Sequence, residues 1–258
     1  MPPETPPPFL RPDVTEHERR QIESMLGPIP DLALLRPVRD GRGREFQRME
    51  FLGDSVLDVV LTVHRWIEPA CVTCVQRPHT PDASDHHLAA VAARAGLGKW
   101  LEWHASHERT ADLVETCVAA CWLTGRWPQT LQFVNAVVHP LGERTLEALV
   151  SGVSGDPGRA ARRVGSAVLE LESGCLVYRS MPDVDEGVLS ESRALRHEAT
   201  AIAKRARHLG EVAGHRFESR DNDTVLSQVE DLVSATLGAS GADAGMQLAA
   251  RFVAGSSD

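Results

Sequence analysis

The sequence predicts an all-α protein. Apolar residues recur at spacings of three and four along most of the 258 residues, which is the pattern of helices that bury one face. The β-branched alternation typical of strands is scarce, and Tyr178 is the only tyrosine. Glycine and proline separate the periodic segments. The helical segments expected from this pattern are 17–26, 47–66, 86–101, 110–123, 128–150, 159–179, 187–209, 225–237 and 243–254.

Composition indicates a folded, soluble chain. Hydrophobic residues make up 42% and charged residues 24%, and no stretch approaches the ~20 apolar residues of a membrane span. Residues 1–15 are proline-rich and lack the pattern of a signal peptide, so we expect a disordered lead. The five cysteines form no disulfide framework. These features predict a cytoplasmic protein with reduced thiols.

A boundary between two domains is expected at 151–159, where SGVSGDPGR interrupts the helical periodicity. The predicted domains are 16–150 and 151–258. Two segments of the first domain have weak counterparts in the second, in the same order, which indicates a duplication. The paired segments are 51–61 with 164–174 and 111–121 with 227–237, which place Gly53 on Gly165 and Glu115 near Glu230 or Asp231.

Two pairs of carboxylates stand at helical spacing among apolar neighbours. Glu50 and Asp54 are four residues apart, and Asp112 and Glu115 are three apart, so each pair shares one helix face. Crowded carboxylates repel each other unless a cation compensates them. If the two helices face each other, their four carboxylates form an all-oxygen site for a hard cation.

The strings around these acids resemble the ribonuclease III family. Glu-Phe-Leu-Gly-Asp-Ser-Val-Leu at 50–57 closely resembles the family signature, and Ala-Asp-x-x-Glu at 111–115 resembles its second acidic motif. The stretch 22–35 is similar to the family's N-terminal segment. The resemblance implies hydrolysis of double-stranded or structured RNA, with Glu50, Asp54, Asp112 and Glu115 holding Mg²⁺, for which Mn²⁺ can substitute.

The second domain resembles the same family with its site eroded. Its segment 182–190 is similar to the element after the family signature, an element that the first domain lacks. The resemblance implies an intramolecular pseudo-dimer with one live site, which would nick one strand. We expect the halves to pack through the helices that begin near 47 and 160. The positions that should be acidic are Arg162, Ser166 and Ser227, and only Glu230 is retained.

The first domain also departs from the family pattern. Gln47 and Phe46 stand where the family usually has glutamate and asparagine, and 71–87 replaces the element kept by the second domain. That segment contains a possible Cys₂His₂ zinc site, but its spacing matches no common zinc module and a buried cysteine pair is the favoured interpretation. Cys117 and Cys121 are expected in the core. The possible zinc ligands are Cys71, Cys74, His79, His86 and His87.

RNA contact requires a local basic patch, because the net charge is −9. The stretch 193–220 has seven basic and three acidic residues, a net charge of +4, although a solvated helix face looks similar. We expect 187–258 to form the second helical domain and not a double-stranded-RNA-binding domain. Two alternatives therefore stay open: an inactive RNA-binding or ribosome-associated protein, and a metal enzyme with a substrate other than RNA. Association of two chains is also left open.

Overall fold

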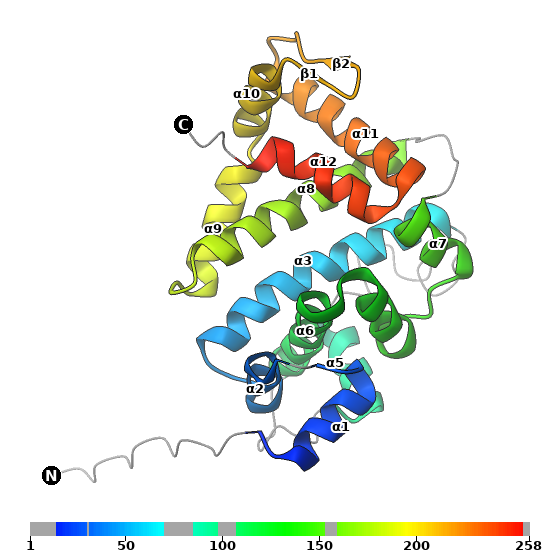
Figure 1. Ribbon diagram of the computed structural model, residues 1–258, viewed down its shortest axis with the longest axis vertical. Helices are drawn as coiled ribbons and strands as arrows, with labels where there is room; N and C mark the ends of the chain where they lie inside the picture. The colour runs from blue at the N-terminus through cyan, green and yellow to red at the C-terminus, as the bar shows by residue number, and fades with distance from the viewer. Residues whose placement is uncertain (1–13, 30, 70–84, 98–106, 153–158, 255–258) are drawn as a thin grey trace, which may run out of the picture.

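The structure is a computed structural model, in which residues 14–29, 31–69, 85–97, 107–152 and 159–254 are described (Figure 1). It is predominantly helical, as predicted. None of the helices in these ranges is both long and apolar enough to cross a membrane.

The first half of the chain is arranged around the long helix α3, which packs against α6 on one side and α8 on the other. The apolar residues of α3 are buried along almost its whole length. The elements of this half are α1 (Glu16–Leu26), α2 (Leu32–Asp40), α3 (Arg44–Ile67), α5 (Asp85–Ala95), α6 (His107–Phe133), η2 (Val134–Val138) and α7 (Glu143–Ser151).

The second half is arranged around α8, which contacts α11, α12 and α9 as well as α3. In Figure 1, α12 lies across α8, and α10 and α11 stand at the end of the molecule farthest from the N-terminus. The elements are α8 (Arg159–Ser180), α9 (Glu186–His197), α10 (Ala199–Leu209), the antiparallel pair β1 (Glu211–Val212) and β2 (His215–Arg216), α11 (Asn222–Ser240) and α12 (Ala242–Val253).

Two expected segments were wrong as single helices. The segment 128–150 is divided among the end of α6, η2 and α7, because Pro140 disfavours helical geometry at His139 (φ −152°, ψ 129°). The segment 187–209 is interrupted at Glu198, whose extended backbone (φ −57°, ψ 137°) separates α9 from α10. Helix α6 itself has a kink at Arg126 (φ 50°). The periodicity also missed α2 and the β1–β2 hairpin.

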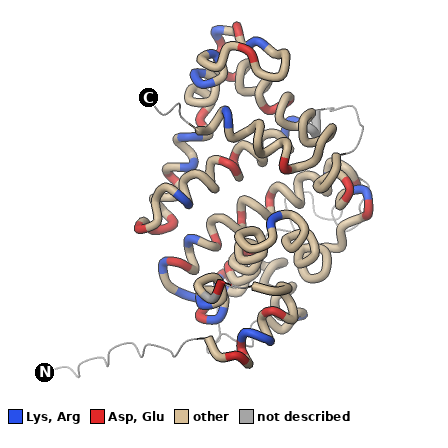
Figure 2. The backbone as a smooth tube through the Cα atoms, in the orientation of Figure 1, with Lys and Arg blue, Asp and Glu red and all other residues tan. Residues whose placement is uncertain are grey.

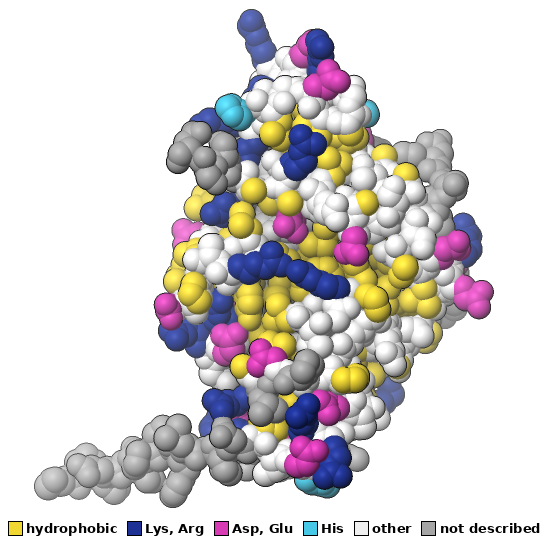
Figure 3. Space-filling model, viewed as in Figure 1, with side chains coloured by type: hydrophobic (Ala, Val, Ile, Leu, Met, Phe, Trp, Pro, Cys, Tyr) yellow, Lys and Arg dark blue, Asp and Glu magenta, His cyan; other side chains and the backbone are white. Residues whose placement is uncertain are grey.

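One apolar core extends through both halves. It includes Leu52 and Val56 on α3, Val114 on α6 and Val168 on α8, all at most 1% exposed. Cys117 and Cys121 are buried in it, as expected. Positions with charged residues are spread along the helices of both halves (Figure 2). One face of the molecule has apolar side chains gathered at its middle (Figure 3). The helices expected near 47 and 160 do pack together, as α3 and α8.

Arg48 on α3 joins the two halves at the end of α8. Its side chain is only 3% exposed, and its guanidinium stacks 4.6 Å over the Tyr178 ring. It donates to the backbone carbonyls of Tyr178 (2.8 Å), Met181 (2.5 Å) and Val184 (3.4 Å). A charged donor thus satisfies one carbonyl in the last turn of α8, which has no intrahelical partner, and two carbonyls of the segment between α8 and α9.

We expect Arg48→Ala to lower the free energy of unfolding by about 2–3 kcal/mol, because three part-buried carbonyls lose a charged donor. Urea denaturation measures this change. Arg44→Ala is the matched control: Arg44 also donates to a carbonyl of the second half, that of Asp183 at 2.9 Å, but it is exposed. Its loss should cost roughly 0.5 kcal/mol or less. Equal costs for the two variants would contradict this account of the junction.

Candidate metal centre

The candidate site is formed where α3 and α6 cross with their backbones in contact. Gly53 lies at the crossing, and a Cβ atom there would stand 1.8 Å from the carbonyl oxygen of Glu115. Only glycine permits this approach. Since Glu50 and Asp54 flank Gly53 on α3, the crossing brings them close to the acids of α6.

Three of the four expected ligands converge. Carboxylate oxygens of Glu50, Asp112 and Glu115 all lie within 4.8 Å of one another. Glu115 is 9% exposed, and the other two are partly buried. Asp54, one helical turn beyond Glu50, is not in this group, and its side chain is 52% exposed. The sequence therefore predicted the acidic centre, but Asp54 lies at its edge.

The convergence has an electrostatic cost that raises the pKa of each carboxyl. Desolvation and then Asp54, Glu50 and Asp112 raise the pKa of Glu115 to about 9. Desolvation and then Asp112 raise the pKa of Glu50 to about 8, and desolvation raises that of Asp112 to about 6. Such a cluster holds protons in the absence of another cation, and a divalent ion would replace them.

Helix α9 of the second half brings two charged residues to this centre. Glu186, in its first turn, helps to raise the pKa of Glu50, Asp54 and Asp112. Arg193 forms an ion pair with Asp54 at 3.9 Å, which opposes the rise in the Asp54 pKa caused mainly by desolvation. Neither residue was predicted from the sequence to lie at the site. The available signal was the segment 182–190, which contains Glu186 and resembles the element that follows the family signature.

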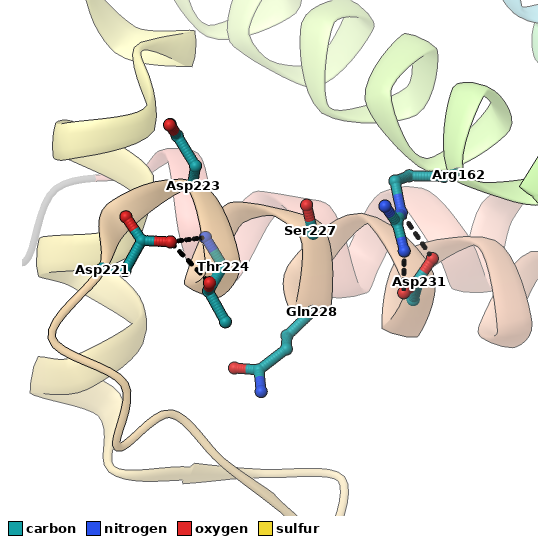
Figure 4. Close-up of a pocket in the computed structure, with 7 residues that line it drawn as sticks. All are labelled: Arg162, Asp221, Asp223, Thr224, Ser227, Gln228 and Asp231. Atoms are coloured by element: carbon teal, nitrogen blue, oxygen red, sulfur yellow. Dashed lines mark hydrogen bonds and ion pairs between the residues drawn. The ribbon is translucent and has the colours of Figure 1, made fainter.

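The second half contains a corresponding crossing. A Cβ atom at Gly165 on α8 would lie 2.0 Å from the carbonyl oxygen of Glu230 on α11. Here Arg162 makes two hydrogen bonds to Asp231, both of 3.1 Å. Figure 4 shows these side chains facing each other at one end of a shallow pocket. The pocket is lined by Arg162, Asp221, Asp223, Thr224, Ser227, Gln228 and Asp231.

An arginine therefore stands in the second half where the first half has the Glu50 carboxylate. Arg162 and Ser166 lower the pKa of Glu230, although desolvation still leaves it raised. A positive charge beside the retained glutamate disfavours a second cation. Among the described residues, the cluster of acids suited to a metal ion is the one on α3 and α6.

Several residues of the expected basic patch make contacts within the fold. Arg205 donates to the carbonyls of Arg196 and Phe252, and Arg207 donates to the Ser219 carbonyl and the Asn222 side chain. Arg216 pairs with Glu211, and Arg193 faces the acidic centre. Arg193, Arg205 and Arg207 thus use their guanidinium groups within the fold, whereas Arg216 is 70% exposed. This finding weakens the argument for RNA contact that rests on its net charge.

Three of the five possible zinc ligands lie outside the described residues. These three are Cys71, Cys74 and His79. His86 and His87 are on α5, and both have interaction partners. The zinc interpretation stays a prediction, and the favoured one, a buried pair of cysteines, also stays untested.

Comparisons with known proteins found no protein-family model and no curated protein that matches the chain. The resemblance to ribonuclease III thus depends on the residues of the motifs and on the geometry that these residues adopt.

The raised pKa values predict that the protein without metal loses stability as pH rises. The folded state holds more protons than the unfolded state between the ordinary carboxyl pKa, about 4.5, and the value of about 9 for Glu115. In that window the free energy of unfolding should fall by up to about 1.4 kcal/mol per pH unit for each group involved. Urea denaturation in a chelator at pH 6 and pH 8.5 measures the slope.

Glu115→Gln should make this slope shallower and stabilise the protein at pH 8.5. Glu230→Gln is the matched control, because Glu230 is also 9% exposed but has Arg162 and Ser166 as partners. It should change the slope less. The same slope in Glu115→Gln and in the unmodified chain would show that Glu115 carries no excess proton.

Proposed function

We propose that this chain is a divalent-metal-dependent endoribonuclease of the ribonuclease III type, which hydrolyses phosphodiesters of double-stranded or structured RNA. One observation carries the proposal. The carboxylates of the two family-like motifs, distant in sequence, meet within 4.8 Å at the α3–α6 crossing. A composition rich in acidic residues would not by itself bring these carboxylates together. Their convergence requires a glycine at position 53, where α3 contacts the backbone of α6.

The donor set fits Mg²⁺, with Mn²⁺ as a substitute. Carboxylate oxygens are the ligands that hard divalent ions prefer, and the crowding of Glu50, Asp112 and Glu115 calls for a compensating charge. When bound, the ion would activate water for attack on phosphorus and stabilise the leaving oxygen. Glu50, Asp112 and Glu115 would hold it, and Asp54 would face the same space from its more exposed position.

The repeated crossing supports a pseudo-dimer of two ribonuclease III-like domains, 16–150 and 151–258. Gly53 with Glu115, and Gly165 with Glu230, make the same backbone approach, and the pairing is the one that the internal sequence similarity predicted. The proposal assigns a single active site to the first domain, because Arg162 is paired with Asp231 in the second. Because the pseudo-dimer would have one active site for two RNA strands, we expect it to nick one strand in each binding event.

A second candidate is a metal enzyme that acts on a substrate other than RNA. The charge around the site favours it: Glu108, Asp85 and Glu186 add to the repulsion within the cluster, and several arginines of 193–220 have internal partners. A polyanion would meet this acidic surface unfavourably. Under the main proposal, divalent ions must be present before RNA binds.

Mg²⁺-dependent cleavage of double-stranded RNA should come from the first domain alone and favour one strand. The test uses a duplex labelled separately on each strand, at low salt because phosphate contacts weaken as salt rises. Asp112→Asn should slow cleavage by roughly 100-fold or more, since it removes a carboxylate of the centre. Glu230→Gln, the matched control, should leave the rate nearly unchanged.

Three results would contradict the proposal. Equal losses in the two variants would exclude the single site, and cleavage that persists in Asp112→Asn would exclude the centre on α3 and α6. Calorimetric binding of Mn²⁺ without cleavage of any structured RNA would favour the non-RNA enzyme or the inactive RNA-binding protein. A binding measurement with the same duplex and the metal-loaded chain then distinguishes these two alternatives. Binding favours the inactive RNA-binding protein, and no binding favours the enzyme with another substrate.

A further inference from the structure

Arg193, on α9 of the second half, contacts the signature segment of α3 through three residues. Its Nη1 donates to the Ser55 hydroxyl at 2.6 Å and lies 3.9 Å from an Asp54 carboxylate oxygen. Its guanidinium carbon is 4.7 Å from the centre of the Phe51 ring. The side chain is 18% exposed. One guanidinium therefore contacts three residues of a five-residue segment.

Helix α8 fixes the other side of the same guanidinium. Nη2 of Arg193 lies 3.5 Å from a carboxylate oxygen of Glu170. Gly174, one turn further along α8, faces the group: a methyl group there would stand 3.5–3.7 Å from Ser55, Arg193 and Phe51. The ring, the hydroxyl and two carboxylates together define both the position and the plane of the guanidinium. A lysine ammonium has no plane to be held in this way.

The position of Asp54 agrees with this restraint. Asp54 shares a helix face with Glu50, but its carboxylate lies outside the group formed by Glu50, Asp112 and Glu115. Its ion pair runs instead toward α9. The ion pair with Arg193 thus holds the Asp54 carboxylate away from the three converging carboxylates.

We infer that Arg193 is a positioning residue, through which the second half holds the Asp54 carboxylate at the edge of the metal centre rather than on the ion. This inference rests on the metal site of the proposed function, but not on RNA as the substrate. Asp54 would then contact water bound to the ion, where an acceptor orients the attacking oxygen. The second half, without a metal centre of its own, would still control the geometry of the first.

The test measures Mn²⁺ affinity by calorimetry in a double-mutant cycle. Arg193→Ala should tighten Mn²⁺ binding by roughly threefold to tenfold, because Asp54 is released and can join the ion. In the Asp54→Asn background the same substitution should change the affinity far less. Thermal denaturation of each variant checks that the fold is kept. A purely structural arginine would weaken binding when removed, and would do so in both backgrounds.

Two further variants separate positioning from loss of charge. Arg196→Ala removes the same charge three residues along α9 and should leave Mn²⁺ affinity nearly unchanged. Arg193→Lys retains the charge without the planar fork and should fall between the unmodified chain and Arg193→Ala. Equal tightening by Arg196→Ala, or tightening by Arg193→Ala that persists without Asp54, would overturn the inference.

Cleavage provides a separate readout. With RNA as substrate and Mn²⁺ at saturation, Arg193→Ala should lower kcat although the metal binds more tightly. No cleavage by any variant, together with the expected cycle in metal affinity, would reject the RNA substrate and leave the role of Arg193 supported. Absence of Mn²⁺ binding by the unmodified chain would reject both.

Discussion

The contact between Gly53 of α3 and the backbone of Glu115 on α6 is the constraint on which the site depends. Helices usually pack with their axes 8–10 Å apart, separated by side chains. Here the missing Cβ lets the two backbones meet, so short acidic side chains from both helices reach one point. The same contact buries Glu115 and produces the repulsion that a cation would relieve. The convergence of the carboxylates and the rise in their pKa values thus both result from the contact at Gly53.

Helix α3 performs two tasks with different faces. Glu50 lies toward α6 in the acidic centre, whereas Arg48, Phe51 and Ser55 contact the second half. Asp54 lies between these two faces, paired with Arg193 of α9. Because both faces belong to one rigid helix, a shift at the junction between the halves would also move the carboxylates. This arrangement explains how residues of α9 and α8 can influence a centre to which they contribute no ligand.

The sequence predicted the helical fold, the two acidic pairs and the correspondence of Gly53 with Gly165. These features are local, because they depend on helical periodicity and on short strings of residues. The position of Asp54 and the role of Arg193 were not predictable, since they depend on how α9 folds back onto α3. The buried contact of His64 with His139, 3.0 Å between ring nitrogens, was missed because it depends on how the residue after η2 lies against α3. Periodicity also failed at Glu198 and Pro140, where a local backbone change interrupts an apolar pattern that continues.

The hydrogen bonds that Arg48 and Arg44 donate to the second half end on main-chain oxygens. Every residue type carries such an oxygen, so substitutions at 181, 183 and 184 leave these acceptors in place. These hydrogen bonds are consequently tolerant of substitution at the acceptor positions 181, 183 and 184 and sensitive to substitution of the two arginines. Such asymmetry allows the second half to diverge while the chain keeps its shape, and diversity at these acceptor positions is compatible with an intact interface.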